Sequence, residues 1–289
     1  MLNPLLVSDL DGTLFNKNKQ VSLHSAAIIN EFVAGGGLFT IATARMTYGC
    51  LTRLTSVDLQ LPLIVMNGAA LYSRRHGAYE HSFPMAEEGV GHLASHILSE
   101  GAGAFIYGIN DGQLRVGYAR DEDLEWTQYN GEAAHRAGTP FTKIGYRDWA
   151  QFGDIVYVAV VGSERQLAAV LTAGEALPGI RALPYRNVYT DTNCLEYASI
   201  DAGKENALRH LLGQTDADGL VVFGDNHNDL DMMNIADLSV APSNAVPDAL
   251  AAATLITETN DEDGVALEIQ RRFLLPLRSR ATAGKGNRD

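Results

Sequence analysis

Apolar runs and amphipathic segments alternate along the first part of the chain. The apolar run at residues 5–7 predicts a buried strand at residues 5–9, and residues 22–34 carry the periodicity of an amphipathic helix. Residues 35–37 are all glycine and are expected to end that helix before a second strand at residues 38–43. A third apolar run covers residues 61–67. Alternation of this kind predicts a parallel sheet covered by helices.

The pattern changes between about residues 83 and 190. A helix is expected at residues 86–99, followed by strands at residues 104–109 and 113–118, joined by the turn Asn110-Asp111-Gly112. Further elements are expected there: a helix at 121–136, a strand at 154–161, a helix at 163–173 and short strands to about residue 198. This mixture predicts an inserted α+β domain.

The last part of the chain returns to the first pattern, with a helix at residues 204–212, a strand at 220–224, a helix at 228–236 and a strand at 238–241. The predicted fold class is therefore α/β, with a doubly wound parallel-sheet core and an inserted α+β cap domain. We place the core in residues 1–82 and 191–270, the insert in residues 83–190, and a flexible basic tail in residues 271–289.

Composition narrows the range of partners. The 289 residues carry a formal charge of −13, which argues against nucleic acid or an anionic membrane as a main partner. An anionic substrate would then need a local cation. Cys50 and Cys194 fit neither a disulfide framework nor a zinc site and are expected to be buried thiols. No apolar run approaches the roughly 20 residues of a membrane span, so a cytoplasmic location without membrane contact is predicted.

Two acidic turns follow predicted buried strands far apart in the sequence. DLDGT covers residues 9–13 and GDNHND covers residues 224–229. Because chemistry in open α/β sheets lies at the carboxyl ends of the strands, the two turns are expected to face one site. Asp9 and Asp11 are two residues apart and can approach that site together, but two close carboxylates need a cation to stay ionised. The oxygen-rich setting favours Mg²⁺.

Each candidate residue also has an ordinary structural interpretation. In an isolated DxDG, the aspartates are as often turn-formers and helix caps. Lys204 could be a surface helix residue, Asn67 could be a turn residue, and Arg45 could either clamp a substrate or pair with an acid at the edge of the sheet. The order of the two acidic turns, with a Thr after a strand and a Lys between them, favours a phosphoryl-transfer site.

These motifs resemble the haloacid dehalogenase-like hydrolase superfamily, and their order resembles its Cof-type, sucrose-phosphatase-like branch. The resemblance covers residues 5 to about 271. It implies that Asp9 is the nucleophile and that Asp11 is the general acid/base, which also lends its backbone carbonyl to the metal. Asp225 would be a metal ligand, and Asp229 would support it from behind.

The resemblance also implies a phosphate-binding set. It consists of Thr43 in IATAR with the amides of Leu10 and Ala44, Lys204, and Asn228, with Arg45 and Asn67 as further candidates. Two positions depart from the family pattern, since Ala44 and Glu205 stand where relatives commonly carry Gly. Ala44 keeps its amide, and Glu205 is expected to face solvent in the first turn of its helix.

The function expected from this resemblance is that of a Mg²⁺-dependent phosphatase acting through an aspartyl-phosphate on Asp9. Its substrate would be a small phosphorylated metabolite, with sugar phosphates the commonest in such relatives, and the insert would exclude water and select the leaving group. Two alternatives remain: a sugar phosphomutase using the same Asp, and a non-catalytic metabolite-binding sensor. Oligomeric state is not predicted.

Overall fold

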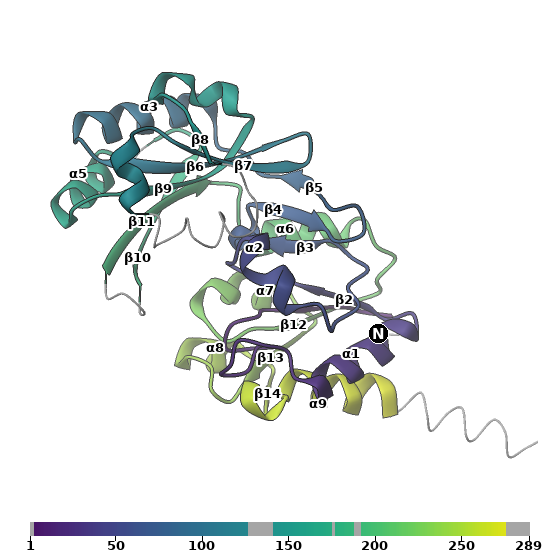
Figure 1. Ribbon diagram of the computed structural model, residues 1–289. Coiled ribbons are helices and arrows are strands. Elements are labelled where there is room, and N and C mark those ends of the chain that lie inside the picture. The colour runs from purple at the N-terminus through teal and green to yellow at the C-terminus, as the bar shows by residue number, and fades with distance from the viewer. Residues whose placement is uncertain (1–2, 127–140, 175–176, 188–191, 276–289) are drawn as a thin grey trace, which may run out of the picture. The chain divides into compact units, whose positions relative to one another are not determined.

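The computed structural model describes the chain except residues 1–2, 127–140, 175–176, 188–191 and 276–289. The chain forms two compact units (Figure 1). Unit 1 consists of Met1–Asn67, Ser73–His76 and Lys204–Asp289, and unit 2 consists of Gly68–Tyr72 and Gly77–Gly203. Unit 2 is thus an insert in unit 1.

Unit 1 is built on a parallel sheet with strand order β14-β13-β12-β1-β2. A bridge between Ala42 and Ile64 adds β3 beside β2. The chain runs outward from β1 through β2 and β3, whereas β12, β13 and β14 extend the sheet the other way, so the strand order reverses beside β1. The strands are β1 (Leu5–Ser8), β2 (Leu38–Ile41), β3 (Leu63–Val65), β12 (Leu220–Phe223), β13 (Leu238–Pro242) and β14 (Leu255–Thr257).

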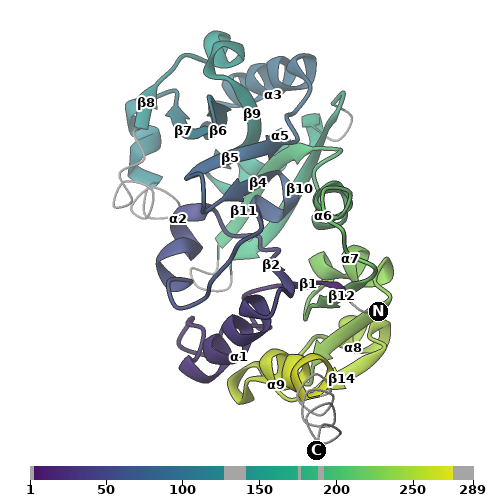
Figure 2. The same ribbon diagram turned by 90° about the vertical axis from the view of Figure 1, so that its right-hand side faces the viewer.

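Helices lie on both faces of this sheet because right-handed crossovers that run in opposite directions place them on opposite sides. One group contains α1, which packs against α9, and another contains α6, α7 and α8 (Figure 2). The hydroxyl of Ser22 caps α1 by accepting a hydrogen bond from the amide of Ser25. The helices are α1 (Leu23–Ala34), α2 (Thr47–Cys50), α6 (Lys204–Leu212), α7 (Leu230–Asn234), α8 (Pro247–Ala252) and α9 (Gly264–Ile269).

Unit 2 is an α+β unit with its own core. Its six-stranded sheet has the order β10-β11-β9-β6-β7-β8 and is antiparallel except between β7 and β8. Two helices, α3 (Glu87–Ser99) and α5 (Glu164–Gly174), pack on this sheet around Trp149 and Tyr197. The strands of unit 2 are β4 (Ala70–Ser73), β5 (Ala78–Ser82), β6 (Gly103–Asn110), β7 (Gln113–Tyr118), β8 (Phe141–Lys143), β9 (Asp154–Val161), β10 (Ile180–Asn187) and β11 (Thr192–Ser199).

The predicted fold class is confirmed, and three local predictions differ from the structure. The helix expected at residues 121–136 begins as a 3-10 helix, Asp121–Trp126, and its remainder lies outside the described residues. The insert was expected to end at residue 190, but β11 pairs with β9 and β10 in the sheet of unit 2. The predicted tail begins as a π-helical turn, Gln270–Leu274, that continues α9, and residues 276–289 lie outside the described part.

Two further expectations concern the whole chain. Both cysteines, Cys50 and Cys194, are buried free thiols, as expected. Among the described residues, the helices are all too short or too polar to cross a membrane.

Candidate active site

The two acidic turns meet at one edge of the sheet of unit 1. Strands β1 and β12 are parallel neighbours, with Ser8 in register with Phe223, so the residues that follow them emerge side by side. The amide of Asp9 donates to the carbonyl oxygen of Phe223 at 2.9 Å, which continues the pairing into the first turn. The carboxylate oxygens of Asp9, Asp225 and Asp229 lie within 4.8 Å of one another, and all three residues are buried. This cluster is a candidate metal centre.

Lys204 contacts two members of the carboxylate cluster. It is the first residue of α6, is 3% exposed, and places its Nζ 2.5 Å from Asp9 Oδ1 and 2.6 Å from Asp229 Oδ1. Burial lowers the pKa of Lys204, but the two carboxylates outweigh burial and raise the pKa above its usual value. Lys204 therefore remains a buried cation, and a site that binds an anionic group needs such a positive charge.

One ammonium does not balance three carboxylates. Burial raises the pKa of Asp9 to about 8; the neighbouring Asp229 and Asp225 add to that rise, and Lys204 opposes it. Burial likewise raises the pKa of Asp225 to about 6, against the hydrogen bond from Thr13. A buried set of oxygen donors with excess negative charge is chemically suited to a hard divalent cation, because such cations prefer carboxylate ligands. The residues present thus fit a metal ion.

Asp229 supports the loop that carries Asp225. Its Oδ2 accepts hydrogen bonds from the amides of Asp225 at 2.9 Å and Asn226 at 3.0 Å, while its Oδ1 contacts Lys204. The side chain of Asn226 in turn accepts from the amides of His227 and Asp229, so Asn226 and Asp229 cap each other. Both oxygens of Asp229 accept hydrogen bonds from protein donors. This agrees with a residue that holds the loop of Asp225 in place and does not itself bind the metal.

The predicted phosphate-binding residues come together on neighbouring loops of unit 1. Thr43 follows β2, and its carbonyl oxygen accepts from the amide of Asn67 at 3.0 Å, while Asn228 Nδ2 donates to Asn67 Oδ1 at 3.1 Å. Asn67 also has φ 54°, so it is both a turn residue and a neighbour of the site. Within the described part of the chain, the backbone amides of Leu10 and Ala44 donate to no backbone acceptor, and Leu10 is fully buried.

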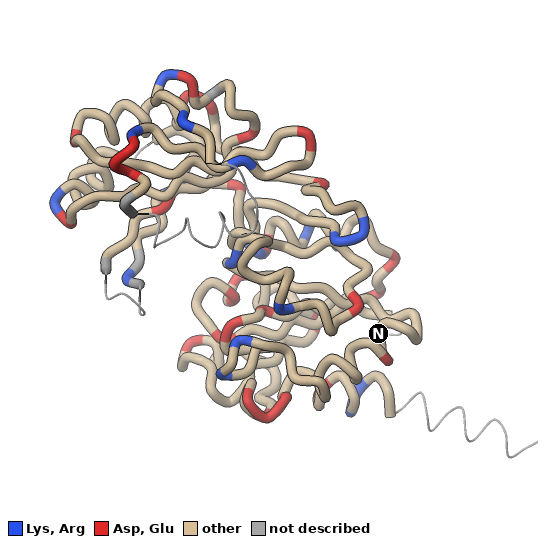
Figure 3. Tube along the Cα trace, in the orientation of Figure 1, with Lys and Arg blue, Asp and Glu red and all other residues tan. Residues whose placement is uncertain are grey.

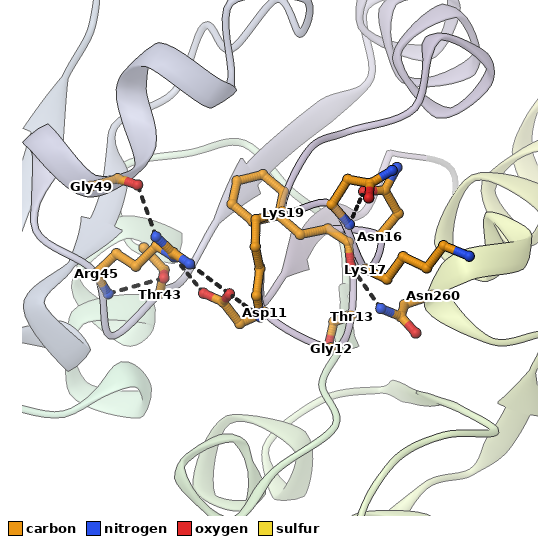
Figure 4. A network of polar contacts seen from close by, with 12 residues as sticks. Asp11, Gly12, Thr13, Asn16, Lys17, Lys19, Thr43, Arg45, Gly49 and Asn260 are labelled. Atoms are coloured by element: carbon orange, nitrogen blue, oxygen red, sulfur yellow. Dashed lines mark hydrogen bonds and ion pairs between the residues drawn. The ribbon is translucent and has the colours of Figure 1, made fainter. Parts of the chain in front are cut away.

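Asp11 lies apart from the carboxylate cluster and has cationic partners of its own. Its Oδ2 accepts from Arg45 Nε at 2.5 Å and its Oδ1 from Arg45 Nη2 at 2.8 Å, with Lys19 Nζ 3.1 Å from the same Oδ1 (Figure 4). Burial would raise the pKa of Asp11, but the hydrogen bonds and charges of Arg45 and Lys19 lower it below its ordinary value. Arg45 was expected either to clamp a substrate or to pair with an acid at the edge of the sheet, and the structure shows it paired with Asp11.

Comparisons with known proteins agree with this geometry. A profile of the haloacid dehalogenase-like hydrolases matches residues 6–269. This chain belongs to that family. It is 25% identical over 279 residues to the Bacillus subtilis 5-amino-6-(5-phospho-D-ribitylamino)uracil phosphatase YwtE, covering 91% of this chain and 96% of that protein.

Solved structures of haloacid dehalogenase-like hydrolases share the fold. A member from Bacteroides thetaiotaomicron superposes with a TM-score of 0.74 at 24% identity, covering 94% of this chain and all of that chain. The subclass IIB sugar phosphatase BT4131 has a TM-score of 0.67 at 18% identity and covers 93% of this chain and 98% of its own. The expected family, fold class and phosphatase class of enzyme are confirmed.

Two residues of this hydrolase were missed by the sequence interpretation. The hydroxyl of Thr13 donates to Asp225 Oδ1 at 2.7 Å and so links the two acidic turns. Lys19 lies six residues beyond Thr13 and carried no motif that would single it out. Glu205, in contrast, behaves as expected: it pairs with Arg209 at 2.9 Å on the outer side of α6.

Proposed function

We propose that this phosphatase hydrolyses the phosphate monoester of a small metabolite with Mg²⁺, through a covalent phosphoryl group on Asp9. The observation that carries the proposal is the buried contact of Asp9 with Lys204 beside the carboxylates of Asp225 and Asp229. A nucleophilic carboxylate needs a neighbouring cation to meet a phosphoryl dianion without repulsion. Lys204 provides one such charge, and the carboxylate cluster is suited to bind the other.

Two displacements would make up the reaction. In the first, Asp9 Oδ forms a bond to phosphorus, the bond from phosphorus to the leaving oxygen breaks, and that oxygen takes a proton from Asp11. In the second, a water oxygen bonds to phosphorus, the bond to Asp9 breaks with its electron pair returning to the carboxylate, and the water proton passes to Asp11. Asp11 therefore serves once as acid and once as base. Because Arg45 and Lys19 lower its pKa, Asp11 is ionised at rest and must take up a proton from solvent before the first displacement, and it regains that proton in the second.

The other predicted residues would bind the phosphoryl group. The amides of Leu10 and Ala44, which donate to no backbone acceptor in the described structure, and the hydroxyl of Thr43 would donate to its oxygens. Asn228 and Asn67, which contact each other, would border it, and Arg45 would act through Asp11 rather than on phosphate.

Magnesium would be held by the carboxylates of Asp9 and Asp225 and by the carbonyl oxygen of Asp11, with Asp229 behind them. When bound, Mg²⁺ neutralises charge on the phosphoryl oxygens.

For the substrate, we propose a phosphorylated sugar or polyol. One relative is named for a phosphoribityl compound and one structural neighbour is titled a sugar phosphatase. Acidic side chains are spread over both units, so an anionic substrate depends on the few local cations (Figure 3). The insert would act as a cap that selects the leaving group, and the cytoplasmic location also stays a prediction.

The test is phosphate release from a panel of sugar, polyol, nucleotide and cofactor phosphates, with and without Mg²⁺, by the native chain and by Asp9→Asn. We expect turnover that requires Mg²⁺ in the native chain and a loss of at least about 10³-fold in Asp9→Asn, because the covalent step disappears. Full activity in Asp9→Asn would overturn the nucleophile. Transfer of the phosphoryl group within the product, without free phosphate, would indicate a phosphomutase, and tight binding without turnover would indicate a sensor.

A further inference from the structure

The carboxylate of Asp11 is fixed by two cations that come from separate segments of unit 1. Lys19 lies in the loop between β1 and α1, and Arg45 lies in the turn after β2. Together they contact both oxygens of Asp11, Arg45 with its Nε and Nη2 and Lys19 with its Nζ (Figure 4). A planar guanidinium that meets both oxygens fixes the orientation of a carboxylate plane, and a second cation fixes its distance.

Each cation is in turn held by its surroundings. Arg45 Nη1 donates to the carbonyl oxygen of Gly49 at 3.0 Å, and its guanidinium carbon lies 5.7 Å from the ring centroid of Phe15. Lys19 has φ 57°, a left-handed conformation that is rare for a lysine, and its amide donates to Asn16 at 2.8 Å. Its carbonyl oxygen accepts from Arg53 Nη1 at 3.1 Å. The left-handed conformation and these two backbone hydrogen bonds thus hold Lys19 where its side chain reaches Asp11.

We propose that Lys19 and Arg45 form a two-cation clamp that positions the carboxylate of Asp11 for proton exchange and keeps it out of the cluster of Asp9, Asp225 and Asp229. Lys19 is then a positioning residue for the reaction, and Arg45 acts on Asp11 and not on the phosphoryl group. The inference rests on the proposed function, because the clamp affects the reaction only if Asp11 is its general acid/base.

The clamp matters most for the second displacement. There the carboxylate of Asp11 must accept a proton from the water that attacks phosphorus, so its distance and direction decide the rate. With p-nitrophenyl phosphate, the first displacement needs little help from an acid because nitrophenolate leaves readily. A misplaced Asp11 would therefore slow the second step alone with this substrate, and the phosphorylated Asp9 would accumulate.

The experiment uses the full chain with Mg²⁺ and p-nitrophenyl phosphate, in Lys19→Met, Arg45→Gln and Asp11→Asn variants. We expect kcat to fall about 10-fold or more in Lys19→Met and Arg45→Gln, a part of the 10²- to 10⁴-fold contribution typical of a general acid/base. Rapid mixing should show a burst of one nitrophenolate per enzyme before the slow steady state. Lys19→Arg keeps the charge and should restore most of kcat.

A double variant isolates the route of the effect. If the clamp acts through Asp11, adding Lys19→Met to Asp11→Asn should cause no further loss of kcat. The matched control is Lys17→Met, an exposed lysine of the same loop whose amide, and not its side chain, bonds to Asp261. It should leave kcat and KM unchanged. Circular dichroism on each variant shows whether the fold is kept, and Lys19→Gln replaces Lys19→Met if the latter does not fold.

Several outcomes would overturn the clamp. A raised KM with unchanged kcat and no burst would mean that the cations bind the substrate directly. A fall in kcat without a burst would mean that the first displacement is slowed, and unchanged kinetics would mean that the clamp has no role. All of these require turnover by the native chain, whose absence would instead contradict the proposed function.

Discussion

Gly12 lies in the first acidic turn, beside the carboxylate of Asp225 in the second. It has φ +87°, and a Cβ built on it would lie 2.3 Å from Asp225 Oδ2. Asp225 cannot move aside freely, because it is buried and its Oδ1 accepts from Thr13. Gly12→Ala should therefore displace the carboxylate and lower kcat/KM on the order of 100-fold, the size expected for a misplacement of about 1 Å.

Gly36 provides a matched control for this substitution. It has φ +89°, nearly the same backbone conformation, but a Cβ there would meet nothing within 4 Å. Both Ala variants should lose about 1 to 2 kcal/mol of unfolding free energy because of the left-handed backbone. Only Gly12→Ala should also weaken Mg²⁺ binding, which calorimetric titration measures. Equal Mg²⁺ affinity in the two variants would mean that Gly12 is needed for its backbone conformation alone.

For individual residues, the order of the motifs predicted that Asp9, Lys204 and Asp225 would share one site. It did not predict which residues each of them would contact. These three follow strands or begin a helix, and adjacent parallel strands bring such positions together whatever the loops do. The partners of Asp11 depend on the path of a loop with a left-handed lysine, which no periodicity encodes. The sequence therefore suggested one cation for two carboxylates, whereas Asp9 and Asp11 have separate cationic partners.

Among the elements, the end of α9 shows how a basic stretch can be ordered by ion pairs, since Arg271 pairs with Glu258 and both Arg271 and Arg272 contact Glu268. Arg271 was expected to begin a flexible tail, yet it lies in a helical turn and its guanidinium binds both oxygens of Glu258, just after β14. The hydrogen bond from Arg271, followed by those from the backbone and Thr257, lowers the pKa of Glu258 from 4.5 to about 2. A lowered folded-state pKa means that ionised Glu258 stabilises the fold.

From this ion pair we predict that the difference in unfolding free energy between the native chain and Glu258→Gln depends on pH. The stabilisation is present above pH 4.5 and is lost as pH falls from 4.5 toward 2, since Glu258 is then protonated in both states. Urea unfolding should find Glu258→Gln less stable than the native chain at pH 6 by a small amount, as for exposed ion pairs, with the difference vanishing toward pH 2. Arg271→Gln should show the same convergence. A difference that does not depend on pH would assign the effect to packing.

Elements with a continuous apolar run or a full apolar face were predictable, including the short strands β1, β2, β3 and β12, and short elements without such a pattern were not. The strand at residues 154–161 and the helix at residues 204–212 agree with β9 and α6, because each has a full apolar face against a core. Short strands such as β8 and β14, with three residues each, carry too little pattern to be seen. The 3-10 helices at Asp121–Trp126 and Tyr146–Phe152 arise from local turns and tertiary packing, which override propensity.

Over the whole molecule, the two units have separate cores, and the chain offers a probe for each. Its two tryptophans, Trp126 and Trp149, both lie in unit 2, and Trp149 is 1% exposed within the core of that unit. Tryptophan fluorescence therefore reports the unfolding of unit 2 alone. The candidate metal centre, in contrast, consists of Asp9, Asp225 and Asp229, which all belong to unit 1.

We expect Mg²⁺ to stabilise unit 1 and leave unit 2 unchanged. A ligand that binds only the folded state adds about 2.7 kcal/mol at 100 times its Kd, and that free energy belongs to the cooperative unit that holds the site. In urea, saturating Mg²⁺ should raise the midpoint of the circular dichroism phase that reports unit 1 but not the midpoint of the tryptophan transition. Asp225→Ala should abolish the first shift. If both midpoints rose together with Mg²⁺, the chain would unfold as one cooperative structure, and the division into a catalytic core and an independently folded insert would be wrong.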